Sequence, residues 1–262
     1  MTRYDDDLRL AHVLADAAER VTMARFRAVD LVVGDKPDLT PVTDADTAVE
    51  DLLRMQLKRT RPRDSVLGEE GGLVGHGPRR WVIDPIDGTK NFIRGVPVWA
   101  TLIALLDGED VVIGLVAAPA LNRRWWAAVG TGAWTGRSLS SATRMSVSGV
   151  SRVADASLSY SGVSRWRTIS RYRSFLALLD ECWRTRAYGD FWSYMLLAEG
   201  TLDVACEPEL ALYDMAALVP IVTEAGGAFT DVNGSPGPWG GSAVATNGLL
   251  HSDVIARLGP PD

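Results

Sequence analysis

The chain has 262 residues, and 27 Lys and Arg against 33 Asp and Glu give it a formal net charge of −6. Its 47% hydrophobic and 23% charged residues are ordinary globular proportions, which exclude disordered and fibrous proteins. Two cysteines cannot build a disulfide framework, no apolar run is long enough to span a bilayer, and the acidic start of the chain is unlike a signal peptide. We therefore expect a cytoplasmic protein that binds neither a membrane nor, given its acidic balance, nucleic acid.

Helical and strand patterns alternate along the first half of the chain. Apolar residues at helical spacing predict a helix over 10–21, behind three aspartates that suit a helix N-terminus. The two prolines and the glycine of 34–41 indicate a loop or flap. Thr43 with Asp46 then resembles a capping box that opens a second helix, whose buried stripe covers 48–57. Short strands are expected at 65–67, 81–83, 101–106, 111–116 and 125–129.

The second half of the chain continues this alternation. The glycines of 130–136 are misplaced for a nucleotide-binding loop and indicate a hairpin loop, and the Ser-rich stretch 138–151 is the expected boundary between two lobes. Further elements are expected as helices at 169–181, 191–199, 214–225 and 249–257 and as strands at 202–205, 228–230 and 243–245. The patterns predict one α/β domain over 1–262, with an N-terminal lobe of about 1–145 and a C-terminal lobe of about 146–262.

Chemistry concentrates where one strand ends. Asp84 and Asp87 follow a buried-type strand, and Gly88 and Thr89 come next. A turn would aim both carboxylates at one point, and a helix opening at Gly88 would add N–H groups that bind an anion. Carboxylates and an oxyanion repel each other, so they share a site only around cations. Oxygen ligands favour Mg²⁺ or Mn²⁺, and the three histidines lie outside this segment.

Other interpretations of this segment can be compared by spacing. Asp84 to Gly88 alone is compatible with a simple Asx turn. An EF-hand loop needs acids at its positions 1, 3 and 5, whereas here they stand at 1 and 4. A phosphatase of the haloacid dehalogenase type would show Asp-x-Asp, and these two aspartates are three residues apart. Both rival motifs therefore fail, and the Asx turn stays open.

Several separated motifs together resemble the inositol monophosphatase family of Mg²⁺-dependent phosphatases over nearly the whole chain. They are 41–46, Gly68-Glu69-Glu70, 84–92, and Tyr213-Asp214-Met215-Ala216-Ala217 leading to 224–227. The family usually has Trp where Tyr213 stands. Within the family, 36–46 and 186–191 most resemble the histidinol-phosphate phosphatase branch. The resemblance implies a layered α-β-α-β-α sandwich of two mixed lobes and a homodimer.

The resemblance also implies roles for individual residues. Glu69, Asp84 and the Ile86 carbonyl would hold a first metal, and Asp84 would bridge to a second metal held by Asp87 and Asp214. Glu69 with Thr89, the latter hydrogen-bonded to Asp46, would orient the attacking water. Two or three Mg²⁺ ions are expected per site, with Mn²⁺ as a substitute. The flap residues Lys36 and Asp38 are possible participants, and Glu70 is interpreted as a solvated neighbour of Glu69. The implied substrate contacts are Glu69, Ile86, Asp87, Gly88, Thr89, Arg186, Gly189, Asp190, Glu207 and Asp214.

These features predict a Mg²⁺-dependent phosphomonoesterase that converts L-histidinol phosphate into L-histidinol and phosphate in histidine biosynthesis. Inositol monophosphatases usually carry a small or hydroxyl residue at the position of Asp190, which suits a neutral polyol. An aspartate there suits a cationic leaving group such as histidinol, with Glu207 beside it and Arg186 steering the phosphate or holding Asp190. The alternatives are a phosphatase for inositol or sugar monophosphates and, from another class, a non-catalytic module that binds metal or anions.

Overall fold

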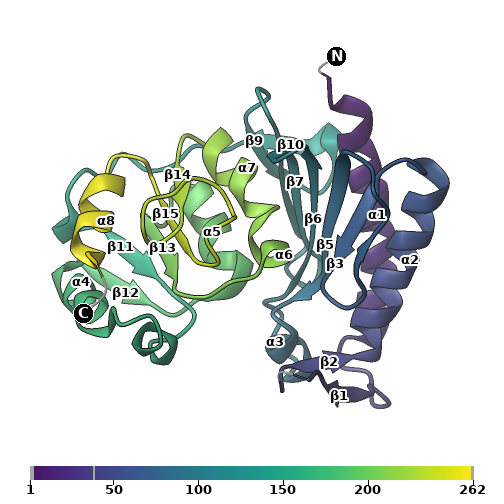
Figure 1. Ribbon diagram of the computed structural model, residues 1–262, viewed down its shortest axis with the longest axis horizontal. Helices are drawn as coiled ribbons and strands as arrows, with labels where there is room; N and C mark the ends of the chain where they lie inside the picture. The colour runs from purple at the N-terminus through teal and green to yellow at the C-terminus, as the bar shows by residue number, and fades with distance from the viewer. Residues whose placement is uncertain (1–2, 38, 261–262) are drawn as a thin grey trace.

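The computed structural model describes residues 3–37 and 39–260, which form two large sheets with helices on both sides of each, and a separate two-stranded sheet (Figure 1). The described residues contain no helix that is both long and apolar enough to cross a bilayer. The 3₁₀ turns are η1 (Pro119–Leu121), η2 (Leu139–Ser141), η3 (Val153–Asp155) and η4 (Ser164–Arg167).

The first sheet has eight strands in the order β10-β9-β8-β7-β6-β5-β3-β4. All neighbours are antiparallel except β3 and β5, which run parallel. The strands are β3 (Ser65–Gly68), β4 (Gly72–Val74), β5 (Arg79–Asp87), β6 (Ala100–Asp107), β7 (Asp110–Ala118), β8 (Arg123–Ala128), β9 (Ala133–Gly136) and β10 (Ala142–Arg144).

Both faces of this sheet are buried, which explains the nearly continuous apolar runs of its central strands. Trp81 and Ile83 of β5 pack against α1 (Asp5–Arg25) and α2 (Asp44–Thr60) on one face. Val82 of β5 and Leu102 of β6 point to the opposite face and pack against the second half of the chain. Successive side chains of a strand alternate between faces, so each central strand serves two cores.

The second sheet has five strands in the order β12-β11-β13-β15-β14. They are β11 (Ser157–Ser159), β12 (Arg184–Arg186), β13 (Val204–Glu207), β14 (Ala228–Thr230) and β15 (Ala243–Thr246). The helices α5 (Asp190–Ala198), α6 (Leu212–Met215) and α7 (Leu218–Glu224) lie between the two sheets, and α4 (Tyr172–Glu181) and α8 (His251–Leu258) cover the outer face (Figure 1). The layers are therefore α-β-α-β-α, which confirms the predicted fold class.

The expected loop or flap at 34–41 is confirmed as the turn of a β-hairpin, but its ends belong to two short strands that were not predicted. β1 (Val33–Asp35) and β2 (Pro41–Thr43) pair antiparallel, with Val33 opposite Thr43. The Lys36 N–H donates to the Thr40 carbonyl across the turn, at 2.8 Å. The side chains of β1 are exposed, so the sequence carries no alternation of apolar and polar residues that would have indicated a strand here.

Other differences from the expected elements have local causes. The expected helix 214–225 divides into α6 and α7. Pro220 has no N–H to donate to the Ala216 carbonyl, and its ring would clash with that carbonyl in a continuous helix. The strand expected at 202–205 lies two residues later, as β13. The strands β4, β9, β10, β11 and β12 were not predicted, and each has only three or four residues. The expected helix at Gly88 is present as α3 (Thr89–Ile93).

Candidate active site

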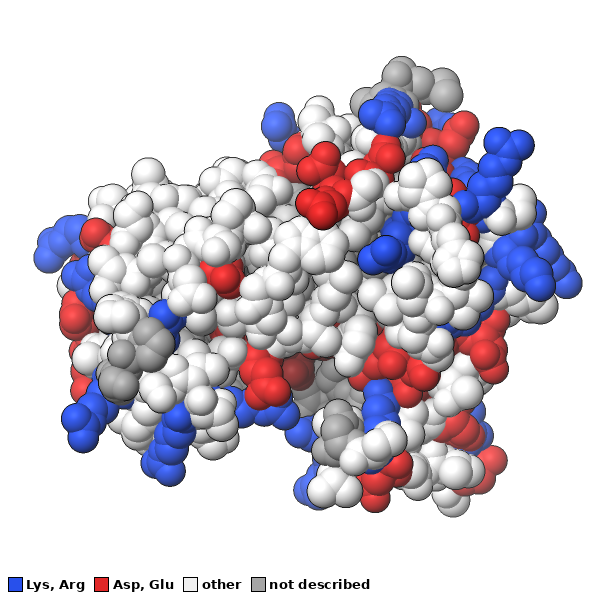
Figure 2. Space-filling view, viewed as in Figure 1, with Lys and Arg blue, Asp and Glu red and all other residues white. Residues whose placement is uncertain are grey.

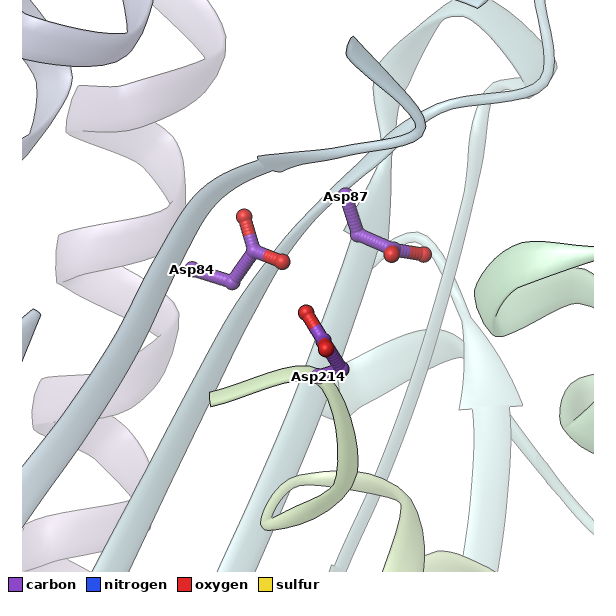
Figure 3. Close-up of side chains that lie close together, drawn as sticks. All are labelled: Asp84, Asp87 and Asp214. Atoms are coloured by element: carbon purple, nitrogen blue, oxygen red, sulfur yellow. The ribbon is translucent and has the colours of Figure 1, made fainter. Parts of the chain in front are cut away.

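Three aspartates from the two halves of the chain converge on one point. Asp84 and Asp87 stand at the end of β5, and Asp214 stands in α6. One carboxylate oxygen of each lies within 4.8 Å of the others, and Figure 3 shows the three side chains pointing toward one another. Residues far apart in the sequence meet here because α6 packs against β5. A group of three carboxylates at this spacing has the composition of a divalent cation site.

A bulge in β5 brings Asp84 and Asp87 together. The pairing of β5 with β6 shifts between these two residues, and the Pro85 carbonyl accepts a hydrogen bond from Thr101 Oγ1 at 2.8 Å. Asp84 Oδ1 also accepts the Ile86 N–H at 3.0 Å, which is the Asx geometry left open by the sequence. The Asx turn and the carboxylate cluster therefore coexist, because the turn itself aims the carboxylates.

Backbone N–H groups orient the other two carboxylates of the cluster. Asp87 Oδ2 accepts the Phe191 N–H at 2.7 Å, in the first turn of α5. Asp214 Oδ2 accepts the Ala211 N–H at 2.7 Å, at the start of α6. Each bond engages one oxygen of its carboxylate, and the lone pairs that remain can bind a cation.

Burial and mutual repulsion raise the pKa of every carboxyl group in the cluster. Burial is the larger cause for Asp84, and the charges of Glu69, Asp87 and Asp214 add to it. The pKa of Asp87 is raised well above its usual value by burial, with Asp190 and Asp214 contributing. Burial raises the pKa of Asp214 to about 7, although the Ala211 N–H opposes the shift. A bound cation would reverse these shifts, so the cluster fits divalent metal.

The flap approaches this cluster through Lys36. Its Nζ lies 2.6 Å from Glu69 Oε1 and 2.7 Å from Glu70 Oε1, in the turn between β3 and β4. Burial opposes the charge of Lys36, but the hydrogen bonds and charges of the two glutamates outweigh it and raise its pKa. Glu70 is only 14% exposed, so its interpretation as a solvated neighbour of Glu69 was wrong. Asp38, the other flap residue singled out from the sequence, lies outside the described residues.

Thr89 and Asp46 lie beside the cluster. Thr89 Oγ1 has two acceptors, the Ile86 carbonyl at 2.9 Å and Asp46 Oδ1 at 3.4 Å. Asp46 is fully buried, and its Oδ2 accepts the N–H and the hydroxyl of Thr43, which confirms the predicted capping box of α2. One oxygen of Asp46 therefore closes the helix while the other faces Thr89. Burial raises the pKa of Asp46, although both Thr43 hydrogen bonds lower it.

Asp190 and Glu207 line the second-half side of the same site. Asp190 opens α5 directly after Gly189, with φ of +50°. Its Oδ2 accepts Asn91 Nδ2 at 3.2 Å, and a Cβ on Gly88 would lie 3.4 Å from the same oxygen. Glu207 ends β13 in a buried position, and burial raises its pKa to about 8, with Asp190 and Asp214 adding to the shift. Buried Oε1 of Glu207 has no hydrogen-bond partner in the described part of the chain.

The structure separates Arg186 from this group. Arg186 is exposed on β12, and its guanidinium donates to the Thr185 carbonyl at 2.7 Å. Its alternative role of steering the phosphate stays a prediction, but no hydrogen bond or ion pair between described residues joins it to Asp190, so Arg186 does not hold that carboxylate in the structure. Asn91 does so instead. Sequence reasoning missed Asn91, although it lies inside the 84–92 motif that carried the family resemblance.

The surface around the site is charged. Figure 2 shows acidic side chains on both sides of the hollow between the two halves of the molecule, with basic side chains next to them. The acidic groups described above are Asp84, Asp87, Asp190, Glu207 and Asp214, with Glu69 and Glu70 on the side of the flap. Such a site attracts cations and cationic groups of a ligand.

Known proteins resemble this chain over nearly its full length. Residues 5–259 match the inositol monophosphatase family. A histidinol-phosphatase of Streptomyces coelicolor is 62% identical, with 98% of each chain covered. A histidinol-phosphatase of Mycobacterium tuberculosis is 56% identical over 97% of this chain and 98% of its own. Among solved structures, an inositol monophosphatase from Zymomonas mobilis is 32% identical with a TM-score of 0.87, over 98% of this chain and 99% of that one.

Proposed function

We propose that this chain, which belongs to the inositol monophosphatase family, is a metal-dependent phosphomonoesterase whose substrate is L-histidinol phosphate. The observation that carries the substrate is the full-length similarity to two histidinol-phosphatases at 62% and 56% identity. The placement of Asp190 supports it independently, because its carboxylate adds a further negative charge beside Asp87 and Glu207 in an already acidic site. A negative charge at this position attracts the cationic groups of histidinol, whereas a neutral polyol gains no such attraction.

Mg²⁺ is the proposed metal, because every candidate ligand is an oxygen atom. Asp84, Asp87 and Asp214 supply the clustered carboxylates, and Glu69 and the Ile86 carbonyl adjoin them. When bound, a pair of divalent cations would lower the pKa of an attacking water and stabilise the charge of the leaving alkoxide. The raised pKa values of Asp84, Asp87 and Asp214 support the fit, since the protein itself leaves their repulsion largely uncompensated.

Thr89 is proposed to orient the attacking water together with Glu69. A hydroxyl carries one proton, and Thr89 can give it to the Ile86 carbonyl or to Asp46. In either case a lone pair of Thr89 Oγ1 remains to accept a hydrogen bond from the water. Asp46 is buried and held by Thr43, so it offers a fixed acceptor that keeps this lone pair aimed. Phosphoryl transfer depends mainly on such positioning and on charge stabilisation.

Recognition of the alcohol portion is assigned to Asp190 and Glu207. Histidinol carries an ammonium group and an imidazole that is partly protonated near neutral pH. Charge-assisted hydrogen bonds from these groups to the two carboxylates would stabilise the complex, and would also meet the unpartnered Oε1 of Glu207. A neutral polyol leaves the buried Glu207 and the half-buried Asp190 without a cationic partner, which disfavours it.

The test is a phosphate-release panel with L-histidinol phosphate, inositol 1-phosphate and a neutral sugar phosphate, each with Mg²⁺ and with a chelator. We expect turnover only with Mg²⁺ and the highest kcat/KM on L-histidinol phosphate. A preference for inositol 1-phosphate would instead identify the chain as an inositol monophosphatase, the alternative function. Absence of metal-dependent turnover on all three would favour the non-catalytic binding module. The homodimer implied by the family and the cytoplasmic location expected from the composition stay predictions, and light scattering of the purified chain tests the first.

A further inference from the structure

A buried glutamate on α2 contacts the backbone of the turn that carries Glu69. Glu50 is 2% exposed and belongs to none of the motifs singled out from the sequence. Its Oε2 accepts the Glu70 N–H at 2.8 Å, and its Oε1 accepts the Gly71 N–H at 2.7 Å. Both donors belong to the turn between β3 and β4, so the carboxylate grips the residues that directly follow Glu69.

Arg54, one helical turn further along α2, extends this contact. Its Nε donates to Glu50 Oε1 at 2.8 Å, and its two terminal nitrogens donate to the carbonyls of Val66 and Gly72, at 3.3 and 2.5 Å. The pair therefore ties α2 to β3 before the turn, to the turn itself, and to β4 after it. The charge of Glu50 is compensated by three donors, which a buried carboxylate requires.

The glycines of the turn allow this close approach. A Cβ on Gly68 would lie 2.3 Å from the carboxyl carbon of Glu50, and a Cβ on Gly71 would lie 2.8 Å from Oε1. The backbone on both sides of Glu69 is thus pressed against the Glu50 carboxylate, and neither glycine can be enlarged without moving it. The Gly68-Glu69-Glu70 motif therefore requires glycine at its first position, because a larger side chain would clash with the Glu50 carboxylate.

We infer that Glu50, supported by Arg54, is a positioning residue that sets where the Glu69 carboxylate lies relative to the carboxylate cluster; this inference rests on the proposed function. Glu69 lies between Gly68 and Glu70, both of which contact the Glu50 carboxylate. The N–H of Glu69 itself donates to the Ile83 carbonyl of β5 at 3.2 Å. Its side chain reaches Lys36, and it lies close enough to the Asp84 carboxyl group to raise the pKa of that group. Weakening the hydrogen bonds between Glu50 and the turn should displace Glu69 from Asp84. Asp87 and Asp214 should stay in place, because other N–H groups hold them.

Glu50→Gln is the direct test, because it preserves size but replaces one acceptor oxygen with an NH₂ that faces an N–H or the Arg54 guanidinium. Losing a partner that orients a metal ligand typically weakens metal affinity by about 10–100-fold. We expect a loss of that size in Mn²⁺ binding, measured without substrate by electron paramagnetic resonance, and a matching rise in the Mg²⁺ concentration for half-maximal activity. kcat at saturating Mg²⁺ should fall much less. Asp51→Asn, on the exposed side of the same helix, is the matched control and should change neither quantity.

Gly71→Ala perturbs the same contact from the turn and leaves α2 untouched, which guards against a variant that fails to fold. It should also weaken Mn²⁺ binding, and the double variant should lose less than the product of the two single losses, because both act through one contact. Unchanged Mn²⁺ affinity in both folded single variants would overturn the inference, as would an equal loss of kcat that saturating Mg²⁺ does not restore. A wild-type chain that binds Mn²⁺ but hydrolyses no phosphate ester would instead refute the proposed function.

Discussion

The stability of the metal-free protein should fall as the pH rises, because Asp214 holds its proton more tightly in the fold than in the unfolded chain. Burial and the neighbouring carboxylates raise its pKa from 3.8 to about 7. A group whose pKa is raised by folding contributes stability that is complete below the unfolded value and is lost as the pH passes the folded value. Each unit of pKa difference corresponds to about 1.4 kcal/mol, so Asp214 accounts for up to about 4 kcal/mol lost between pH 4 and 7.

Mg²⁺ should reverse this loss at neutral pH. A ligand that binds only the native state stabilises it by RT ln(1 + [L]/Kd), which is about 2.7 kcal/mol at a hundredfold excess over Kd. The cation also favours the ionised carboxylates, so its effect should be small at pH 5 and large at pH 8. Urea unfolding followed by fluorescence, with chelator or with Mg²⁺ at both pH values, measures the four free energies of unfolding.

The control for this prediction is Asp214→Asn, in which the side-chain oxygen can still accept the Ala211 N–H. This variant cannot ionise, so its metal-free form should show a shallower decline between pH 5 and 8 and a reduced response to Mg²⁺. Glu207, whose pKa is raised from 4.5 to about 8, should sustain part of the remaining decline across this whole range. If the metal-free wild type is equally stable at pH 5 and pH 8, or if the variant declines as steeply, the electrostatic account of the cluster is refuted.

Three further substitutions test the roles assigned to single side chains. Asp87→Asn should lower kcat by at least about a hundredfold in a chain that still folds; near-normal activity at limiting Mg²⁺ would remove Asp87 from the ligands. Thr89→Val keeps the backbone N–H and removes the hydroxyl, so kcat should fall far more than KM rises; an effect on KM alone would limit Thr89 to phosphate binding. Asp190→Asn suits the positive φ better than alanine does and removes only the charge. It should lower kcat/KM for L-histidinol phosphate at least tenfold more than for a neutral sugar phosphate, and equal losses on both would contradict the recognition of a cationic alcohol.

The kind of chemistry and much of the local structure could be predicted from the amino-acid sequence. Two aspartates at a strand end, followed by Gly88 and Thr89, indicated an oxygen-ligand cation site beside a helix start, and the capping box at Thr43 and Asp46 was readable from spacing alone. These features are local, because capping and strand termination depend on residues within a few positions of each other. The order of the α-β-α-β-α layers followed from the family resemblance rather than from periodicity.

The contacts between side chains from distant segments could not be predicted, because they depend on how the elements pack in three dimensions. Whether Asp214 meets Asp84 depends on α6 packing against β5, and whether Arg186 or Asn91 holds Asp190 depends on where β12 lies in the second sheet. The short strands β11 and β12 have too few residues for a periodic pattern, so their pairing could not be predicted. Glu50 is the strongest case: in the sequence it is one acid among many on a helix, and only the fold places it, buried, against the backbone beside Glu69. Spacing along the chain reports local geometry, whereas contacts between distant segments are set by how the layers pack.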